Sequence, residues 1–219
     1  HDEIRSLKKI TVIACGTAYH AGMVAKYAIE KWAKISVEVE IASEYRYRDP
    51  IVDSSTLVVA ISQSGETMDT LMAVRHAKAA GARVLAICNT NSSTIPRESD
   101  AVIYTHAGPE IGVASTKAFT AQVTILTLMA LSLAHKKGTI SESTFRTMLA
   151  ELEAIPEKVK RVLETDALIE QIASEYKDAS NALYLGRGSS FPVALEGALK
   201  LKEISYIHAE GYRYLLTYM

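Results

Sequence analysis

Short apolar runs alternate with segments of helical periodicity along residues 1–137 of the chain. Strands are predicted over residues 8–14, 37–41, 57–61, 83–88 and 101–104. The segments with helical spacing cover residues 18–32, 43–48, 69–80 and 115–136. Strands that alternate with helices over short connections form parallel sheets that are covered on both faces. We therefore expect an α/β domain here, a doubly wound five-stranded parallel sheet flanked by helices.

A purely helical pattern follows this region. Helices are predicted over residues 141–164, with an interruption at Pro156, and over residues 166–176. We therefore expect a helical connector over residues 138–180.

The strand–turn–helix pattern restarts after the connector. Residues 182–185 predict a strand and residues 192–208 a helix. The turn between them, residues 185–189 (Leu-Gly-Arg-Gly-Ser), is similar to residues 13–17 (Ile-Ala-Cys-Gly-Thr), which indicates an internal duplication. We expect residues 181–219 to be the incomplete start of a second copy, with room for one strand and one helix. The two turns alone leave an alternative open. Any strand–glycine–helix unit resembles any other, so the similarity does not require a duplication.

A loop of hydroxyls, an amide and a glycine joins the third predicted strand to its helix. This loop is residues 62–67 (Ser-Gln-Ser-Gly-Glu-Thr). Free backbone N–H groups and the positive end of a helix dipole converge at such a place, which predicts an anion site with phosphate as the expected anion. The loop contains no lysine. A sugar phosphate therefore fits it better than a nucleoside triphosphate, whose site usually adds a P-loop lysine.

Two further turns lie at the start of predicted helices. Cys15-Gly16-Thr17 follows the first strand, and with a strand order 2-1-3-4-5 it would face the same crevice as the 62–67 loop. The alternative for Thr17 is a simple N-cap in a tight turn. For residues 113–117 (Val-Ala-Ser-Thr-Lys) we favour helix capping with a solvated lysine over an anion contact.

Glu196, Lys200 and Glu203 fall within a narrow arc of the last predicted helix, which has apolar residues on almost every side. Two carboxylates and a lysine in such surroundings should have perturbed pKa values, which suits proton transfer. The alternative is an exposed ion pair on a helix that faces a partner, and the helix alone favours that alternative slightly. His20 and Trp32, on the first helix, are interpreted as packing or interface residues.

Composition narrows the range of partners. The 219 residues carry a formal net charge of −1, from 24 basic and 25 acidic residues, which favours neither nucleic acid nor an anionic membrane. The longest apolar stretch, residues 123–134, is too short to span a bilayer and predicts a buried helix. Residues 1–9 are charged and lack a signal-peptide core. Two cysteines at strand ends predict a reduced, cytoplasmic setting, and no metal-ligand spacing is present.

Four motifs occur together and in order: residues 15–17, 62–67, 110–117 and 195–210. With them the chain resembles, over about residues 10–212, the isomerase part of the glutamine–fructose-6-phosphate aminotransferase family, also called glucosamine-6-phosphate synthases. The resemblance implies sugar isomerase (SIS) domains with a flavodoxin-like strand order. The family converts fructose 6-phosphate and glutamine-derived ammonia to glucosamine 6-phosphate, without a metal or cofactor in this part.

The resemblance also implies roles for individual residues. Those expected to bind the substrate are Gly16, Thr17, Ser62, Gln63, Ser64, Thr67, Val113 and Ser115. By this resemblance, the phosphate of the sugar would be held by Ser62, Gln63, Ser64 and Thr67, and the sugar itself would contact Thr17 and Val113. Glu203 would move the proton between C1 and C2, with Lys200 and Glu196 supporting it.

The chain departs from the family's pattern in places. The family has a glutaminase domain with a terminal catalytic cysteine, a ring-opening histidine after the stretch that ends at Tyr212 here, and a Schiff-base lysine. Residues 213–219 (Arg-Tyr-Leu-Leu-Thr-Tyr-Met) stand where that histidine is expected. We therefore expect weak binding of a hexose phosphate and little turnover by this chain.

Two other classes of protein compete with the enzyme interpretation. One is a sugar-phosphate-sensing SIS module of a regulatory protein, although no basic recognition helix accompanies it. The other is a purely structural, dimer-forming module. In every case we expect a homodimer or a swapped assembly, because the apolar helices lack a second copy to cover them.

Overall fold

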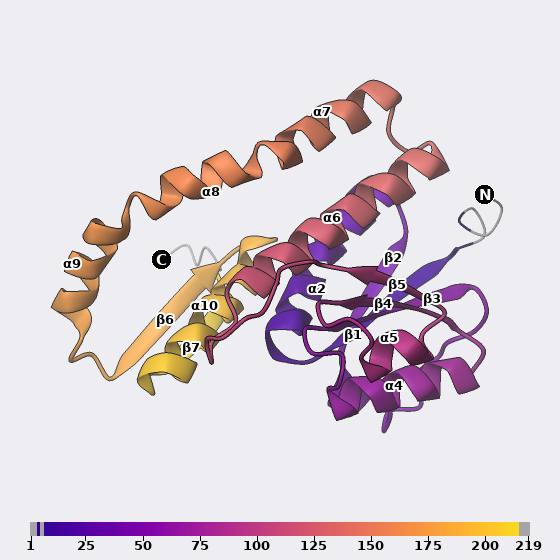
Figure 1. Cartoon of the computed structure of the whole chain (residues 1–219), viewed down its shortest axis with the longest axis horizontal. Helices are drawn as coiled ribbons and strands as arrows, with labels where there is room; N and C mark the ends of the chain where they lie inside the picture. The colour runs from indigo at the N-terminus through magenta and orange to yellow at the C-terminus, as the bar shows by residue number, and fades with distance from the viewer. Residues whose placement is uncertain (1–3, 5–6, 215–219) are drawn as a thin grey trace, which may run out of the picture.

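A computed structural model describes residue 4 and residues 7–214, and it contains a five-stranded parallel sheet (Figure 1). The strands are β1 (Lys9–Ala14), β2 (Ser36–Ile41), β3 (Thr56–Ser62), β4 (Arg83–Cys88) and β5 (Ala101–Tyr104). Their order is β2-β1-β3-β4-β5, and every neighbouring pair is parallel. The predicted α/β fold and strand order are therefore confirmed.

Helices cover both faces of this sheet. One face packs against α2 (Gly16–Ala28), the π-helical turn η1 (Ile29–Ala33) and α6 (Lys117–Lys137), and the other against α3 (Ala42–Tyr45), α4 (Met68–Ala79) and α5 (Thr94–Glu98). Side chains of a strand alternate between the faces. In β3, Val59 and Ile61 join the core under α2 and α6, while Val58 and Ala60 join the core under α4. This two-sided burial explains why the strand is an unbroken apolar run.

Helix α6 is long and apolar enough to cross a membrane. The apolar stretch 123–134, from which we predicted a buried helix, is only part of it. Its inner face is nevertheless part of the core, where Leu126, Ala130 and Ala134 are fully buried. The core helix of a soluble domain can have the same length and composition, and the packing of α6 against α2 and η1 accounts for its apolar character.

Three details of this region differ from the prediction. The helix predicted from residue 115 begins at Lys117, and the first helix ends in the π-helical turn η1. The short helix α5 was not predicted, because five residues with a central Pro96 carry too little periodicity.

The connector is helical, as predicted, and extends as an arm beside α6 before it returns toward the last strands (Figure 1). It consists of α7 (Glu142–Glu153), α8 (Ile155–Leu163) and α9 (Asp166–Tyr176). Ser141 caps α7 by accepting a hydrogen bond of 3.1 Å from the Thr144 N–H. The break between α7 and α8 lies just before Pro156, which occupies the first turn of α8, where it needs no N–H. None of the residues in these three helices is buried.

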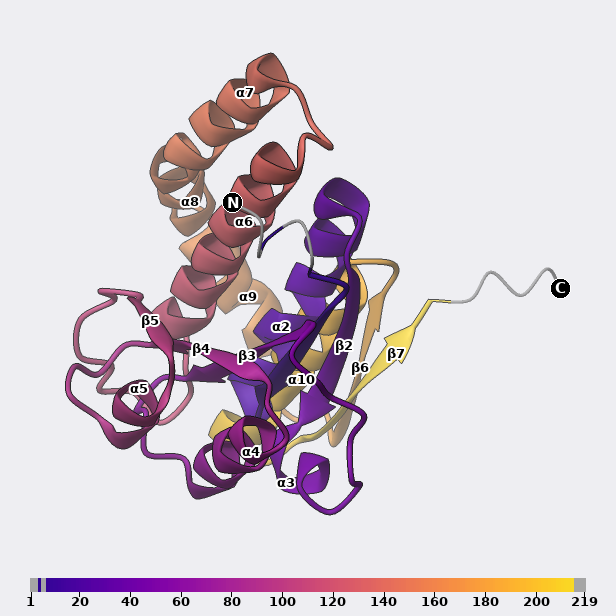
Figure 2. The ribbon, with the colours of Figure 1, turned by 90° about the vertical axis from the view of Figure 1, so that its right-hand side faces the viewer.

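The last part of the described chain is a β–α–β unit: β6 (Asn181–Gly186), α10 (Ser190–Ser205) and β7 (His208–Arg213). Strands β6 and β7 pair in parallel as a separate two-stranded sheet, and α10 lies against α2 (Figure 2). The prediction of only one strand and one helix is therefore wrong. Tyr206 ends α10 in the left-handed region, at a φ of 61°, which frees residues 208–213 for the second strand. The glycine at 211 permits close packing, because a Cβ there would lie 2.8 Å from Leu195 Cδ2.

Candidate functional site

The 62–67 loop joins the carboxyl end of β3 to the first turn of α4. Two of its amides are paired within the loop: the Gly65 N–H donates to Ser62 Oγ at 3.0 Å, and the Glu66 N–H donates to Ser64 Oγ at 3.2 Å. Ser62 Oγ also shares a hydrogen bond of 3.0 Å with Thr67 Oγ1. Among the described residues, the N–H groups of Ser64 and Thr67 have no hydrogen-bond partner. The loop thus keeps free main-chain donors, including those of Ser64 and Thr67, near the amino end of α4.

Glycine is required at the centre of this loop. Gly65 has a φ of 69°, and a Cβ at this position would lie 2.8 Å from Cys88 Sγ and collide with the side chain of Ser93. The Gly65 carbonyl accepts a hydrogen bond of 2.9 Å from the Ile95 N–H. The loop is therefore held tightly against the end of β4 and the start of α5.

Glu66 is the one acidic side chain of the loop, and it turns to α5. Its carboxylate accepts a hydrogen bond of 2.8 Å from the Thr94 N–H. Hydrogen bonds from Thr94 hold the pKa of Glu66 below its ordinary value. The carboxylate is thus engaged outside the loop and does not compete with an anion for the free amides.

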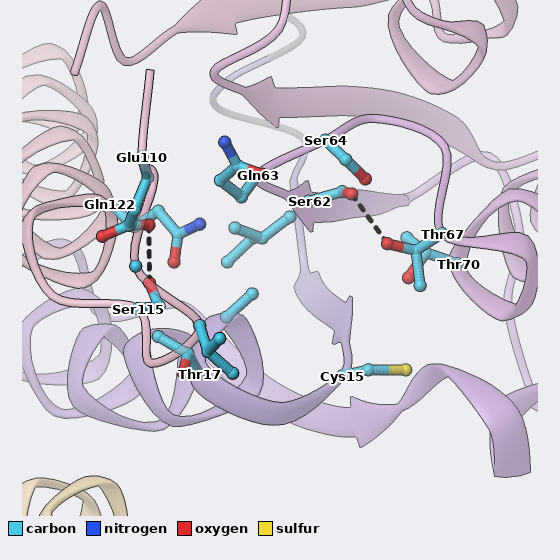
Figure 3. A pocket seen from close by; sticks show the side chains of 14 residues that line it. Cys15, Thr17, Ser62, Gln63, Ser64, Thr67, Thr70, Glu110, Ser115 and Gln122 are labelled. Atoms are coloured by element: carbon cyan, nitrogen blue, oxygen red, sulfur yellow. Dashed lines mark hydrogen bonds between the residues drawn. The ribbon is translucent and has the colours of Figure 1, made fainter. Parts of the chain in front are cut away.

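A cavity of about 280 Å³ opens beside the loop (Figure 3). Three connections at the carboxyl ends of the strands line it, namely β1–α2, β3–α4 and β5–α6. Of the predicted substrate-binding residues, it is lined by Thr17, Ser62, Gln63, Ser64, Thr67, Val113 and Ser115. Gly16 does not line it, and begins α2 with a φ of 53°. Val113 lies at the rim, with 94% of its surface exposed.

Glu110 organises the side of the cavity that precedes α6. Its carboxylate accepts hydrogen bonds from Ser115 Oγ at 3.0 Å and from the Thr116 N–H at 2.7 Å. Burial alone would raise the pKa of Glu110, but the hydrogen bonds from Thr116 and Ser115 outweigh it and lower the pKa. We expected a hydroxyl of Ser115 or Thr116 to cap α6. The acceptor that caps this helix is instead the carboxylate of Glu110. Lys117 is exposed, in line with the favoured interpretation.

Glu196 connects α10 to the turn that begins α2. It is 6% exposed, and its carboxylate accepts a hydrogen bond of 2.9 Å from Thr17 Oγ1. His20 Nδ1 lies 2.7 Å from the second carboxylate oxygen, and Lys200 Nζ lies 3.4 Å from the first. Burial would raise the pKa of Glu196, but the hydrogen bonds from His20 and Thr17, together with the charge of Lys200, lower it overall. His20 is thus a polar partner rather than only a packing residue.

Lys200 extends this network to Glu203. Its Nζ donates to Thr17 Oγ1 at 3.1 Å and to Glu203 Oε2 at 2.6 Å. The Glu203 side chain is 33% exposed, so its surroundings are less apolar than we expected. None of Glu196, Lys200 and Glu203 lines the cavity, and Thr17 is the residue shared by the cavity and this network.

Several residues of the site escaped prediction. His20 contacts Glu196, and Glu110 contacts Ser115 and Thr116, but no local sequence pattern predicts these contacts. Glu110 is nevertheless the first residue of one of the four motifs. Gln122, from the second turn of α6, also lines the cavity. Across the described part of the chain, no group of three or more His, Cys, Asp or Glu side chains could hold a metal ion.

Comparisons with known proteins agree with this arrangement. The SIS domain family matches residues 3–132 and 175–214. Glutamine–fructose-6-phosphate aminotransferase (isomerizing) from Corynebacterium diphtheriae is 61% identical over 210 residues, which is 95% of this chain and 34% of that protein. The same-named protein from Mycobacterium tuberculosis H37Rv is 59% identical over 210 residues, which is 96% of this chain and 34% of that protein. The chain thus spans about a third of the length of these relatives.

The fold is also similar to a solved structure, the C-terminal domain of glucosamine-fructose-6-phosphate aminotransferase from Francisella tularensis. The TM-score is 0.94 and the sequence identity 48%, over 97% of this chain and 60% of that one. With the family match covering more than half of its residues, the chain belongs to the SIS domain family.

Proposed function

We propose that this chain binds fructose 6-phosphate as the isomerase part of a glutamine–fructose-6-phosphate aminotransferase. In the full-length enzyme, a glutaminase domain would supply ammonia, and the product would be glucosamine 6-phosphate. The relatives that bear this name are about 60% identical over nearly the whole chain. The observation that carries the proposal is the pair of free N–H groups at Ser64 and Thr67, beside a polar cavity at the amino end of α4.

The phosphate would sit against the 62–67 loop. The free amides, the hydroxyls of Ser64 and Thr67 and the positive end of the α4 dipole favour a dianion there. Ser62 would orient Thr67 through their shared hydrogen bond, and Gln63 would complete the wall of the site. The sugar would then extend toward Thr17, Val113 and Ser115 on the other side of the cavity (Figure 3).

Glu203 is the proposed carrier of the proton between C1 and C2 of the sugar. Lys200 would position Glu203, since the two side chains form an ion pair of 2.6 Å, and buried Glu196 would anchor Lys200. Thr17 links this network to the cavity. Because Glu203 is partly exposed and does not line the cavity, we expect this chain alone to bind a sugar phosphate and to turn it over slowly.

A homodimer in the cytoplasm is also proposed. Leu183 and Leu185 on β6, and Leu168 and Ile169 on α9, are more than half exposed, and exposed apolar groups of this kind favour association. Both cysteines are free thiols, which suits a reducing compartment. Light scattering tests the dimer: Leu183→Ser with Leu185→Ser should reduce the mass to that of one chain, and a wild-type monomer would refute the proposal.

A thermal-shift titration tests the proposed binding. Fructose 6-phosphate should raise the melting temperature of the wild-type chain, and Ser64→Ala combined with Thr67→Ala should abolish the shift. Ser174→Ala, on the exposed helix α9, is the matched control and should leave the shift unchanged. If the double variant retained the full shift, the loop would not be the phosphate site. A shift without any isomerisation by the full-length protein would favour the sensing module instead.

A further inference from the structure

One buried polar side chain of the cavity has no role in the binding or proton transfer proposed above. Gln122 projects from the second turn of α6, is 2% exposed and lines the cavity. Its Oε1 atom is fully buried and has no hydrogen-bond partner among the described residues. Figure 3 shows its amide reaching from α6 into the space between Glu110 and Gln63.

An unpaired amide in this place is costly for the folded protein. Buried polar groups are nearly always hydrogen-bonded, and a buried acceptor without a partner loses its hydration with no compensation. A leucine or methionine would pack on the same helix face without this cost. A ligand that donates a hydrogen bond to Gln122 Oε1 would remove this cost and would explain why an amide stands at this position.

A second unpaired group faces the same cavity. Thr70, in the first turn of α4, is fully buried, and its Oγ1 atom has no partner in the described part of the chain. It lies next to Thr67, at the end of the cavity formed by the 62–67 loop, whereas Gln122 lies beside Glu110 and Ser115 (Figure 3). Two unsatisfied polar side chains thus converge on one space from opposite sides, which points to a polar ligand longer than a phosphate ion.

We propose that Gln122 is a specificity residue that hydrogen-bonds a hydroxyl of the bound sugar. This inference rests on the proposed function, because the phosphate must occupy the 62–67 loop for the sugar to reach α6. An amide can accept from one hydroxyl and donate to another. The neighbouring carboxylate of Glu110 cannot easily take this role, since Ser115 and Thr116 already occupy it. Gln122 would therefore favour a polyhydroxylated phosphate ester over phosphate alone.

Isothermal titration of this chain with two ligands separates the roles of loop and amide. The variant is Gln122→Met, which keeps the length of the side chain and removes its polar atoms. The affinity for fructose 6-phosphate should fall about tenfold, the effect of one hydrogen bond, while the affinity for inorganic phosphate stays within about twofold of wild type. The melting temperature of the ligand-free variant should be equal to or a few degrees above that of wild type, because an unpaired buried amide has been removed.

The control is Gln171→Met on the exposed helix α9, which should change neither affinity. The inference would be overturned if Gln122→Met bound fructose 6-phosphate as wild type does, or if it lost both ligands equally. A lowered melting temperature in the absence of ligand would also contradict it, because it would reveal a structural partner for the amide. Failure of the proposed function has a different signature: Ser64→Ala with Thr67→Ala would leave both affinities unchanged.

Discussion

Thr17 Oγ1 donates a hydrogen bond of 2.9 Å to Glu196 Oε1, and so joins two helices whose residues are 179 positions apart in the chain. The bond connects the turn that lines the cavity to the helix that carries the proposed proton carrier. Because Glu196 is buried and also contacts His20 and Lys200, this one carboxylate ties the last β–α–β unit to the five-stranded domain. The contact therefore helps to set the position of the cavity relative to Glu203.

Glu196→Gln should destabilise the chain by about 2 kcal/mol, the value of a buried hydrogen bond to a charged group. The amide retains only one acceptor, while Thr17, His20 and Lys200 all approach this side chain. Urea unfolding followed by circular dichroism measures the loss. Glu170→Gln, on the exposed helix α9, is the control and should change stability by less than about 0.5 kcal/mol. Equal stability of wild type and Glu196→Gln would show that the network contributes nothing to folding.

The contribution of Glu196 should depend on pH. Its pKa in the folded protein is lower than the ordinary value of 4.5, so the unfolded chain binds the proton first as the pH falls. The stabilisation is thus fully present above pH 4.5 and is lost as the pH falls through the folded pKa. The difference in urea midpoint between wild type and Glu196→Gln should shrink as the pH falls below about 5. A difference that grows below that pH would contradict this assignment.

Gly65→Ala should be far more harmful than Gly81→Ala. Both glycines have positive φ angles, of 69° and 86°, so each substitution strains the backbone by about 1–2 kcal/mol. At Gly81 nothing lies within 4 Å of the added methyl group, whereas at Gly65 it would meet Cys88 and Ser93. The clash should add about 1–3 kcal/mol and displace the loop, with loss of sugar-phosphate binding. Thermal melts with and without fructose 6-phosphate measure both effects. Similar behaviour of the two variants would mean that the loop is loosely packed.

The pattern of the chain was sufficient to predict the five-stranded sheet and the position of the 62–67 loop between β3 and α4. Strands β1, β3 and β4 contain apolar runs that mark them in the sequence, and the strand order was implied by the family resemblance. The contact of His20 with Glu196 joins residues 176 positions apart, so it could not be predicted from local periodicity. Strand β7 was missed for a related reason. Its sequence, His-Ala-Glu-Gly-Tyr-Arg, contains one buried apolar residue, Ala209, and it forms only by pairing with β6.

Glu203→Gln should slow proton exchange without weakening binding. If Glu203 carries the proton between C1 and C2, deuterium from the solvent should enter the sugar phosphate during slow turnover by the wild-type chain, and NMR of the sugar detects it. The variant should exchange at least about 100-fold more slowly, the typical contribution of a general base. Its affinity for fructose 6-phosphate should match that of wild type, because Glu203 does not line the cavity. An unchanged exchange rate would remove Glu203 from the mechanism.

The central claim is that the free amides of Ser64 and Thr67 receive the phosphate of a sugar. An NMR titration of ¹⁵N-labelled protein with fructose 6-phosphate tests it directly, since every backbone amide is observed at once. The account predicts that the amide signals of Ser64 and Thr67 move first and furthest, and that unphosphorylated fructose leaves them in place. Signals that stay still in this loop while others shift elsewhere would contradict it.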